Sequence, residues 1–214
     1  MLKVNEIFYS IQGESSYAGL PCVFVRLTGC NLRCSYCDTS YAYEEGKDFE
    51  IGEIIDRVIS YRCRLVEITG GEPLIQKETP YLISQLVEKR FEVLLETNGS
   101  LDISLVDERC IKIVDIKCPS SGQEKKNDLE NLKRLSFKDE IKFVIGNRED
   151  YLYAENIVSL IRKNNLTIKP PLLSPLHNQM DPKRLAEWIL EDHLDVRMQI
   201  QLHKIIWGTE VRGV

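Results

Sequence analysis

Three of the seven cysteines lie within eight residues of one another, and they are the strongest sign of metal chemistry in the sequence. Cys30, Cys34 and Cys37 form a Cys-x3-Cys-x2-Cys pattern, and the aromatic Tyr36 comes directly before the third cysteine. Three thiolates on one short loop can each bind one iron of a 4Fe-4S cubane and leave the fourth iron without a protein ligand. The pattern therefore predicts a cluster with one iron open to a substrate or cofactor.

A structural zinc site is the alternative interpretation of these cysteines. Zinc in such sites takes four ligands, and no fourth ligand follows closely, because His177, His193 and His203 all lie far downstream. The spacing therefore favours the iron–sulfur cluster. The other four cysteines are scattered, and Cys22 and Cys110 adjoin apolar runs, which predicts small buried side chains.

Length, charge and cysteine usage limit the class of protein. With 214 residues the chain has room for one well-buried domain, which we expect to span residues 1–214. The net charge of −5 favours neither nucleic acid nor an anionic membrane as a partner. The odd number of cysteines argues against a disulfide framework, and the N-terminus lacks the apolar core of a signal peptide. Since no segment approaches the roughly 20 apolar residues that span a bilayer, we expect a cytoplasmic protein.

The elements that must position the cysteines alternate between strand-like and helix-like patterns. Strands are predicted at residues 22–27, 65–69, 92–96, 111–116, 141–145, 167–173 and 197–202. Helices are predicted at residues 51–59, 81–89, 128–135 and 151–163, and from Asp181-Pro182 onward, where a capping residue precedes a proline. Such alternation implies right-handed crossovers and a parallel sheet with helices outside. The prediction is an α/β fold with about six parallel strands, in an open or partial (β/α) barrel.

A second motif follows the strand predicted at residues 65–69. Gly70-Gly71-Glu72-Pro73 places two glycines where the backbone can approach a ligand closely, and the Glu72 carboxylate can orient an ammonium group. Taken alone, the segment also fits an ordinary turn at the end of a strand. Residues 96–99 (Glu-Thr-Asn-Gly), at the end of the next strand, are either a further wall of the same site or a plain Asn-Gly turn.

The cysteine spacing, Tyr36 and the Gly70–Pro73 segment together resemble the radical S-adenosylmethionine (SAM) superfamily. The resemblance implies that the amine and carboxylate of the cofactor's methionine part chelate the open iron. It also implies that an electron from the cluster cleaves the sulfonium bond and releases a 5′-deoxyadenosyl radical. The cofactor supplies this chemistry, and the protein supplies position and exclusion of water.

The stretch before the cysteines is more specific. Residues 6–14 and 19–26 resemble the 7-carboxy-7-deazaguanine synthase family, and the resemblance continues through Gly71 and returns at residues 96–99 and 201–204. It is loose in the middle of the chain, where the segment from Asp115 to Gly122 departs from the family's pattern. The resemblance implies conversion of 6-carboxy-5,6,7,8-tetrahydropterin to 7-carboxy-7-deazaguanine with loss of ammonia, in the route to queuosine and related nucleosides.

The resemblance also implies the site residues. Substrate contacts fall on eight positions: Ile11, Gln12, Gly13, Glu14, Arg26, Thr69, His203 and Val214, the last through its carboxylate. SAM contacts fall on Tyr36, Cys37, Asp38, Gly71, Glu72, Cys118, Pro119, Ser120, Ser174, Pro175, Leu176 and His177. The planar fork of Arg26 suits the substrate's carboxylate, although an arginine ending a strand can also be a surface residue. Thr39 corresponds to a magnesium ligand, and its hydroxyl is a hard ligand of the kind that Mg²⁺ accepts, but it also fits a helix cap.

The resemblance further implies a homodimer, and an electron donor such as flavodoxin or ferredoxin. Two other functions share some of these motifs. An activase that places a glycyl radical on a partner enzyme has the same cysteine spacing but needs a protein-docking groove. A non-enzymatic electron-transfer or structural metal domain needs no Gly70–Pro73 segment. Residues 12–14 and 201–204 favour the small pterin substrate over both alternatives.

Overall fold

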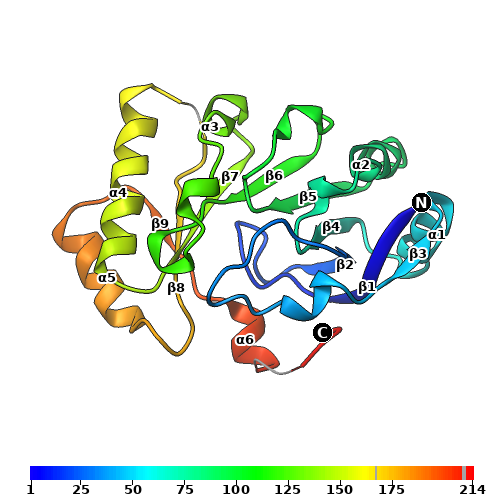
Figure 1. Ribbon diagram of the computed structural model, residues 1–214, viewed down its shortest axis with the longest axis horizontal. Coiled ribbons are helices and arrows are strands. Elements are labelled where there is room, and N and C mark those ends of the chain that lie inside the picture. The colour runs from blue at the N-terminus through cyan, green and yellow to red at the C-terminus, as the bar shows by residue number, and fades with distance from the viewer. Residues whose placement is uncertain (167, 209–210) are drawn as a thin grey trace.

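The described strands all belong to one sheet. The computed structural model describes residues 1–166, 168–208 and 211–214, and its nine-stranded sheet has the order β3-β1-β2-β4-β5-β6-β7-β8-β9 (Figure 1). Neighbours are parallel from β2 to β9, whereas β1 runs antiparallel to both β2 and β3. The strands are β1 (Leu2–Ile11), β2 (Pro21–Leu27), β3 (Lys47–Phe49), β4 (Leu65–Gly70), β5 (Glu92–Thr97), β6 (Ile111–Asp115), β7 (Glu140–Ile145), β8 (Leu172–Pro175) and β9 (Arg197–Met198).

Helices connect the parallel strands and lie along the outside of the sheet (Figure 1). They are α1 (Ile51–Ser60), α2 (Thr79–Glu88), α3 (Asn131–Arg134), α4 (Arg148–Lys163), α5 (Pro182–Glu191) and α6 (Leu202–Ile206). The start of α5 is capped as the sequence predicts, since the Asp181 carboxylate accepts a hydrogen bond from Lys183 N (2.9 Å). The predicted α/β fold is confirmed, and the parallel run holds seven strands where about six were expected.

The antiparallel strand β1 is the main difference from the predicted order. The sequence pattern predicts no strand before residue 22, yet Leu2 and Val4 are buried on alternate positions and extend the core. The register of β1 against β2 shifts between Val4 and Glu6. Such a shift interrupts the period-two pattern from which strands are predicted, and it hides β1 in the sequence.

The last two predicted strands occupy fewer residues than expected. The strand predicted at residues 167–173 is β8, which begins at Leu172, and residue 167 lies outside the described residues. Of residues 197–202, the first two form β9, and the last begins α6.

Alternating side chains give the sheet an apolar face toward the helices, whereas the opposite face carries both charged residues and a smaller apolar cluster that includes Phe24, Leu94 and Ile113. The helix-facing residues of β2, β4 and β5 form one buried cluster: Val23, Val25, Leu27, Val66, Ile68, Val93 and Leu95. Residues of β6 and β7 pack with α4 in a second cluster, which includes Val114, Ile141, Phe143, Ile145 and Ile157. Burying these side chains fixes the register of every central strand, because a slip by one residue would exchange the two faces.

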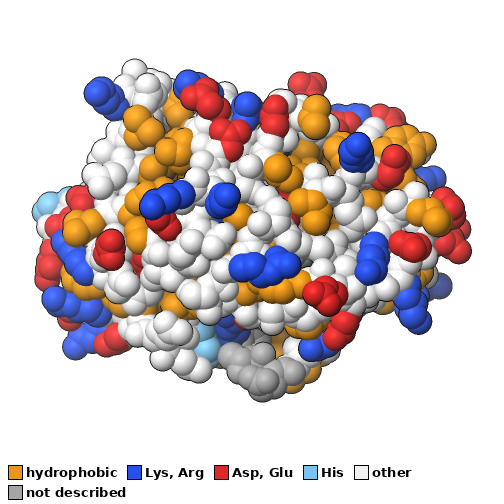
Figure 2. Space-filling view, viewed as in Figure 1, with side chains coloured by type: hydrophobic (Ala, Val, Ile, Leu, Met, Phe, Trp, Pro, Cys, Tyr) orange, Lys and Arg blue, Asp and Glu red, His pale blue; other side chains and the backbone are white. Residues whose placement is uncertain are grey.

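Three of the four cysteines outside the Cys-x3-Cys-x2-Cys pattern are buried, and Cys63 is half-buried. Cys22 and Cys110 are fully buried, as predicted, and all seven cysteines are free thiols. On the face of the molecule in Figure 2, acidic and basic side chains are interspersed. Within the described parts of the chain, no helix has the length and apolar character needed to cross a membrane.

Candidate active site

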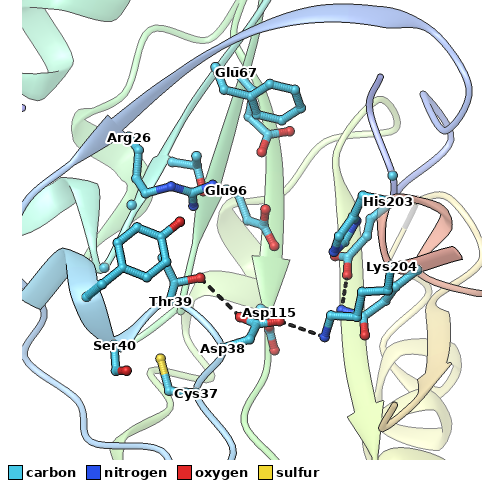
Figure 3. A pocket seen from close by; sticks show the side chains of 18 of the residues that line it. Arg26, Cys37, Asp38, Thr39, Ser40, Glu67, Glu96, Asp115, His203 and Lys204 are labelled. Atoms are coloured by element: carbon cyan, nitrogen blue, oxygen red, sulfur yellow. Dashed lines mark hydrogen bonds and ion pairs between the residues drawn. The ribbon is translucent and has the colours of Figure 1, made fainter. Parts of the chain in front are cut away.

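One cavity collects the predicted site residues at the carboxyl ends of the parallel strands. Its volume of about 450 Å³ lies within the range of small-molecule sites. Residues at or just past the ends of β4, β5 and β6 line it, among them Gly71, Asn98 and Lys117. In open α/β sheets this edge is where ligands bind. Figure 3 shows Arg26 on one side of the cavity and His203 with Lys204 on the opposite side.

Cys30, Cys34 and Cys37 all line this cavity from the loop that follows β2. We call residues 28–40 the cysteine loop. It has little regular structure, so hydrogen bonds to other segments must hold it in place. Ser35 donates from its backbone nitrogen to Ser121 O (3.1 Å) and from Oγ to Ser120 O (2.7 Å). These bonds tie the cysteine loop to the turn that follows β6.

Gly71 is required by the close approach of the cysteine loop to the end of β4. A Cβ atom at Gly71 would lie 2.1 Å from Gly29 O and 2.7 Å from Cys30 Cβ. The backbone nitrogen of Glu72 donates to the same Gly29 carbonyl (2.8 Å). The glycines of the second motif, which the sequence associates with a ligand, therefore also seat the protein's own cysteine loop.

The Glu72 carboxylate belongs to this support and is absent from the cavity lining among the described residues. It is fully buried and accepts hydrogen bonds from Leu74 N (3.0 Å), Thr97 Oγ1 (2.8 Å) and Asn98 N (2.7 Å). The side chain of Asn98 in turn donates to Asn31 Oδ1 (3.1 Å), next to Cys30. Glu72 therefore fastens the end of β5 to the cysteine loop, through its carboxylate and its backbone nitrogen.

The cysteine donor set fits an iron–sulfur cluster better than a single zinc ion. Within residues 1–166, 168–208 and 211–214, no three His, Cys, Asp or Glu side chains are gathered closely enough to hold one metal ion. A cubane separates its ligands more widely, because each thiolate binds a different iron. Burial raises the pKa of the Cys30 and Cys34 thiols, so their deprotonation depends on binding a metal. The Tyr36 hydroxyl lines the same cavity and is buried without a hydrogen-bond partner among the described groups.

All eight residues implied for substrate contact line the cavity, namely Ile11, Gln12, Gly13, Glu14, Arg26, Thr69, His203 and Val214. Gly13 and His203 touch, since a Cβ atom at Gly13 would lie 2.0 Å from His203 Nδ1. Leu202 N donates to Gly13 O (2.9 Å), which attaches α6 to the loop after β1. Burial lowers the pKa of His203, and the imidazole is therefore mostly neutral at pH 7.

Arg26 extends its guanidinium group from β2 into the cavity. Its Nε donates to Glu6 Oε1 (2.7 Å), and the group lies over the rings of Phe8 and Tyr41, 5.6 and 5.8 Å from their centroids. These contacts fix the plane of the guanidinium and use one of its nitrogens. Near the C-terminal end, Arg212 also lies over the Tyr41 ring, 3.9 Å from its centroid.

A group of buried and half-buried charged residues on the face opposite the helices forms the floor of the cavity. We call this group the charged floor; its members are Glu14, Glu67, Glu96, Asp115, Lys117 and Lys142. The Lys142 ammonium is its centre, since it pairs with Glu14 and Glu96 and lies 3.5 Å from Asp115 Oδ2. The same Asp115 oxygen pairs with Lys117 Nζ at 3.0 Å. Figure 3 shows Glu67, Glu96 and Asp115 in one row between Arg26 and Lys204.

Burial and neighbouring charges set the ionisation states in the charged floor. Burial acts to raise the pKa of Glu14, but Lys142, His203 and Gln201 together outweigh it, so the pKa lies below its ordinary value. Lys117 and Lys142 lower the pKa of Asp115 in the same way against burial. Burial and the nearby Glu96 raise the pKa of Glu67 well above its ordinary value. Glu67 also accepts a hydrogen bond from the side chain of Gln12.

The charged floor has a signal in the sequence that motif analysis misses. Glu67 is the one charged residue of β4, whereas Glu96, Asp115 and Lys142 each share a mostly apolar strand with one other charged residue. Alternate residues of parallel strands point to one face, and buried charges need partners. Together, the two rules predict that charges on neighbouring strands meet on the face opposite the helices.

Asp38 and Thr39 lie in the cysteine loop beside Cys37, at the edge of the cavity. Lys204 Nζ pairs with Asp38 Oδ2 at 2.7 Å, and Thr39 Oγ1 donates to Asp38 Oδ1 at 3.0 Å (Figure 3). Although burial opposes it, the Lys204 ammonium lowers the pKa of Asp38 to about 2. The Thr39 hydroxyl makes no side-chain cap to the short helical turn that follows it.

Six other residues implied for cofactor contact lie outside the cavity lining, namely Cys118, Pro119, Ser120, Ser174, Pro175 and His177. Cys118 is fully buried, and Ser120 Oγ donates to the Asp150 carboxylate at the start of α4. His177 borders a second hollow of about 360 Å³. Of the residues implied for cofactor contact in segments 118–120 and 174–177, Leu176 alone belongs to the described cavity lining.

Comparisons with known proteins find relatives along the whole chain. The family model of the Radical SAM superfamily matches residues 24–167. The 7-carboxy-7-deazaguanine synthase of Chlorobaculum tepidum is 46% identical over 220 residues, which cover 100% of this chain and 97% of the relative. The 7-carboxy-7-deazaguanine synthase of Koribacter versatilis is 43% identical over 229 residues and is covered completely, as is this chain.

Solved structures share the fold. The crystal structure of QueE from Escherichia coli matches with a TM-score of 0.75 and 24% identity over 94% of each chain. Streptococcus suis SuiB bound to S-adenosylmethionine matches with a TM-score of 0.57 and 13% identity, over 81% of this chain and 48% of SuiB. The partial barrel that the sequence predicts is therefore the architecture of this chain.

Proposed function

This chain belongs to the 7-carboxy-7-deazaguanine synthase family of radical SAM enzymes, and we propose that it converts 6-carboxy-5,6,7,8-tetrahydropterin to 7-carboxy-7-deazaguanine with loss of ammonia. The observation that carries the substrate assignment is the convergence of all eight implied contact residues on one cavity. Its volume of about 450 Å³ suits a small molecule. An activase with a protein substrate is not favoured, because the full-length relatives are named as synthases.

The cysteine loop would hold the cofactors of the superfamily. Cys30, Cys34 and Cys37 would ligate a 4Fe-4S cluster, and Tyr36 and Gly71 would contact SAM beside it. When bound, these two groups supply the electron and the carbon-centred radical that begin the reaction. The protein's own contribution is to hold the loop rigidly, through the hydrogen bonds of Ser35 and Glu72.

The opposite walls of the cavity offer groups that complement a carboxylated pterin. The guanidinium of Arg26, already fixed in plane by Glu6 and two aromatic rings, would grip the substrate's carboxylate. The ionised Glu14 would accept hydrogen bonds from the N–H donors on the pterin edge. The neutral His203, seated on Gly13, would pack against the substrate without adding a charge.

We also propose that Thr39 ligates Mg²⁺. Its hydroxyl lies in the cavity lining beside Asp38 and is not used as a helix cap. Mg²⁺ binds few protein ligands and keeps several waters or substrate oxygens, so one hydroxyl at the edge of a substrate cavity is a suitable protein contribution.

The proposed setting is a homodimer of single-domain chains in the cytoplasm, reduced by a donor such as flavodoxin or ferredoxin. One sheet spans both core clusters, which supports a single domain over residues 1–214. Seven free cysteines suit a reducing compartment. The exposed apolar side chains of Ile205, Ile206 and Trp207, at α6, support an interface between two copies.

The test is anaerobic reconstitution with iron and sulfide, followed by addition of a reductant, SAM and 6-carboxytetrahydropterin. We expect mass spectrometry to detect 7-carboxy-7-deazaguanine and ammonia in equal amounts. Tetrahydropterin without the 6-carboxyl group serves as the matched control and should not be converted. Fully loaded protein that cleaves SAM but leaves the carboxylated pterin unchanged would show that the substrate is a different molecule.

A further inference from the structure

We propose that Lys142 is a positioning residue of the substrate pocket, whose ammonium group holds Glu14 in the place and the ionised form in which it binds the substrate. The inference rests on the proposed function and extends it to a residue that lies outside the sequence motifs. Lys142 comes from β7, whereas Glu14 comes from the loop after β1, 128 positions earlier. The contact therefore joins two distant parts of the chain at the cavity floor.

The two oxygens of Glu14 have different partners within the protein. Oε2 accepts from Lys142 Nζ, and Oε1 accepts from the side-chain amide of Gln201. The side chains of Lys142 and Glu14 are 5% and 10% exposed, so little water can replace either bond. A carboxylate has about four acceptor positions, and these two bonds fix Glu14 while leaving positions free for a ligand in the cavity.

Lys142 is also the counter-ion of the other carboxylates that border Glu14. Glu96 pairs with the same ammonium, and Asp115 Oδ2 lies 3.5 Å from it. The charged groups that face this centre are therefore Glu14, Glu67, Glu96, Asp115 with its partner Lys117, and His203 near Glu14. Without the ammonium, burial and like charges would both favour protonation of Glu14 or its displacement from Glu96.

A purely structural role for Lys142 is the alternative, and the chain offers a matched control for it. Lys112, on the neighbouring strand β6, has a side chain that is 6% exposed and pairs with the buried Asp139 at 3.4 Å. It is absent from the described lining of the cavity. Lys112→Met therefore removes a comparable buried ion pair without touching the charged floor.

The experiment measures the Kd of 6-carboxytetrahydropterin by anaerobic calorimetry between about pH 6 and about pH 8.5. A Glu14 carboxyl whose pKa is raised by the loss of the ammonium would titrate in this range. The variants are Lys142→Met, Lys142→Arg, Lys112→Met, Glu14→Gln and the double variant Lys142→Met/Glu14→Gln. The iron content of each protein is measured to verify the cluster. Carbon-13 NMR of labelled glutamate carboxyls, assigned with Glu14→Gln, reports the charge of Glu14 in the absence of substrate.

We expect Lys142→Met to raise the Kd at about pH 6 by at least about tenfold, and we expect binding to recover toward about pH 8.5 as Glu14 regains its charge. The Glu14 carboxyl should titrate in this range in Lys142→Met and not in the parent. Lys142→Arg should keep Glu14 ionised. In the Glu14→Gln background, Lys142→Met should add little further loss, because both changes act through one group. Lys112→Met should lower the melting temperature and leave the Kd unchanged.

Three results would overturn the inference. The first is a parent-like Kd in Lys142→Met with Glu14 still ionised. The second is equal weakening by Lys112→Met, which would indicate general destabilisation. The third is full additivity of Lys142→Met and Glu14→Gln. If Lys142→Met does not fold, Lys142→Arg decides: a Glu14 carboxyl that titrates between about pH 6 and about pH 8.5 in this variant, which keeps the positive charge, would overturn the inference. Failure of the iron-loaded parent to bind the pterin would instead overturn the proposed function, and this inference with it.

Discussion

The cysteine loop and the charged floor border the same cavity, but their residues are distributed differently along the chain. The cysteine loop is one continuous segment, and its three thiols lie within eight residues. The charged floor is drawn from the loop after β1 and from β4, β5, β6 and β7, and its central pair joins residues 128 positions apart. The loop is held mainly by backbone hydrogen bonds, whereas the floor is held by ion pairs.

This difference determines which changes each region tolerates. Thiolates on a loop can adjust to a metal cluster, because the ligand bonds themselves fix the geometry. Buried ion pairs depend on the register of several strands, because an uncompensated buried charge is costly. We therefore expect substitutions in the cysteine loop to remove a cofactor and leave the fold intact, and substitutions in the floor to alter substrate binding and pH dependence.

The largest effect is expected for Cys34→Ala, which removes one of the three thiols of the cysteine loop. Each thiolate supports one iron, so the loss of one leaves the cubane unsupported. We expect loss of the cluster and of turnover, with an unchanged far-ultraviolet circular dichroism spectrum. Iron and sulfide analysis after anaerobic reconstitution measures the effect. Cys110→Ala is the control, since its fully buried thiol lies outside the cavity lining and should leave iron loading unchanged.

The same difference explains how much could be predicted from the sequence. Spacing alone identifies Cys30, Cys34 and Cys37, because the ligands of one cluster follow each other on one loop. The strands of the parallel run could be predicted as short apolar runs, and the helices between them by apolar residues that repeat with a period of about 3.6. The register shift within β1 conceals that strand, since it breaks the period near Glu6.

The charged floor required the structure because it depends on which strands are neighbours. Glu67 and Lys142 are visible in the sequence as charges in apolar strands, but their meeting depends on the sheet order. The support given by Glu72 also required the structure. Its place in a known motif implies a cofactor contact, and the sequence does not reveal that its carboxylate accepts hydrogen bonds from Thr97 and Asn98.

The next largest effect is expected for Arg26→Lys, in the wall of the cavity that β2 provides. Lysine keeps the charge but cannot form a bidentate grip on a carboxylate, and one lost charge-assisted hydrogen bond costs about 1.5–3 kcal/mol. The expected result is a fall in kcat/KM of roughly tenfold to hundredfold, measured with saturating SAM. Arg197→Lys, in the exposed end of β9, is the matched control. Parent kinetics in Arg26→Lys would show that another residue binds the carboxylate.

A smaller effect is expected for Thr39→Ala, which separates magnesium binding from cluster binding within the cysteine loop. The variant loses one hard oxygen ligand and retains all three thiols, so iron content should match the parent. We expect the stimulation of turnover by Mg²⁺ to weaken several-fold, roughly the effect of losing one modest interaction of about 1 kcal/mol. Thr39→Ser keeps the hydroxyl and should respond like the parent. An Mg²⁺ titration that is identical in parent and Thr39→Ala would remove Thr39 from the metal site.

Glu67→Gln tests the charged floor through folding rather than activity, because it changes the pH dependence of stability. Burial and the neighbouring Glu96 raise the pKa of Glu67 in the folded protein well above its ordinary value. As the pH rises above about 4.5, the unfolded chain releases this proton while the folded chain retains it. The unfolded state then binds fewer protons, so the free energy of unfolding falls with rising pH, by at most about 1.4 kcal/mol per pH unit.

Glutamine keeps an oxygen that can accept the hydrogen bond from Gln12 and cannot ionise. Urea unfolding of the parent and Glu67→Gln at several pH values should therefore show a stability difference that grows in favour of the variant from about pH 5 to about pH 8. Glu14 and Asp115 do not contribute to this change, because lysines lower their pKa values and both stay ionised over the range. His203 titrates in the opposite sense but equally in both proteins, and it cancels in the difference. A constant difference across the range would mean that Glu67 is ionised in the folded protein, and that the cations of the floor reach beyond Glu14, Glu96 and Asp115.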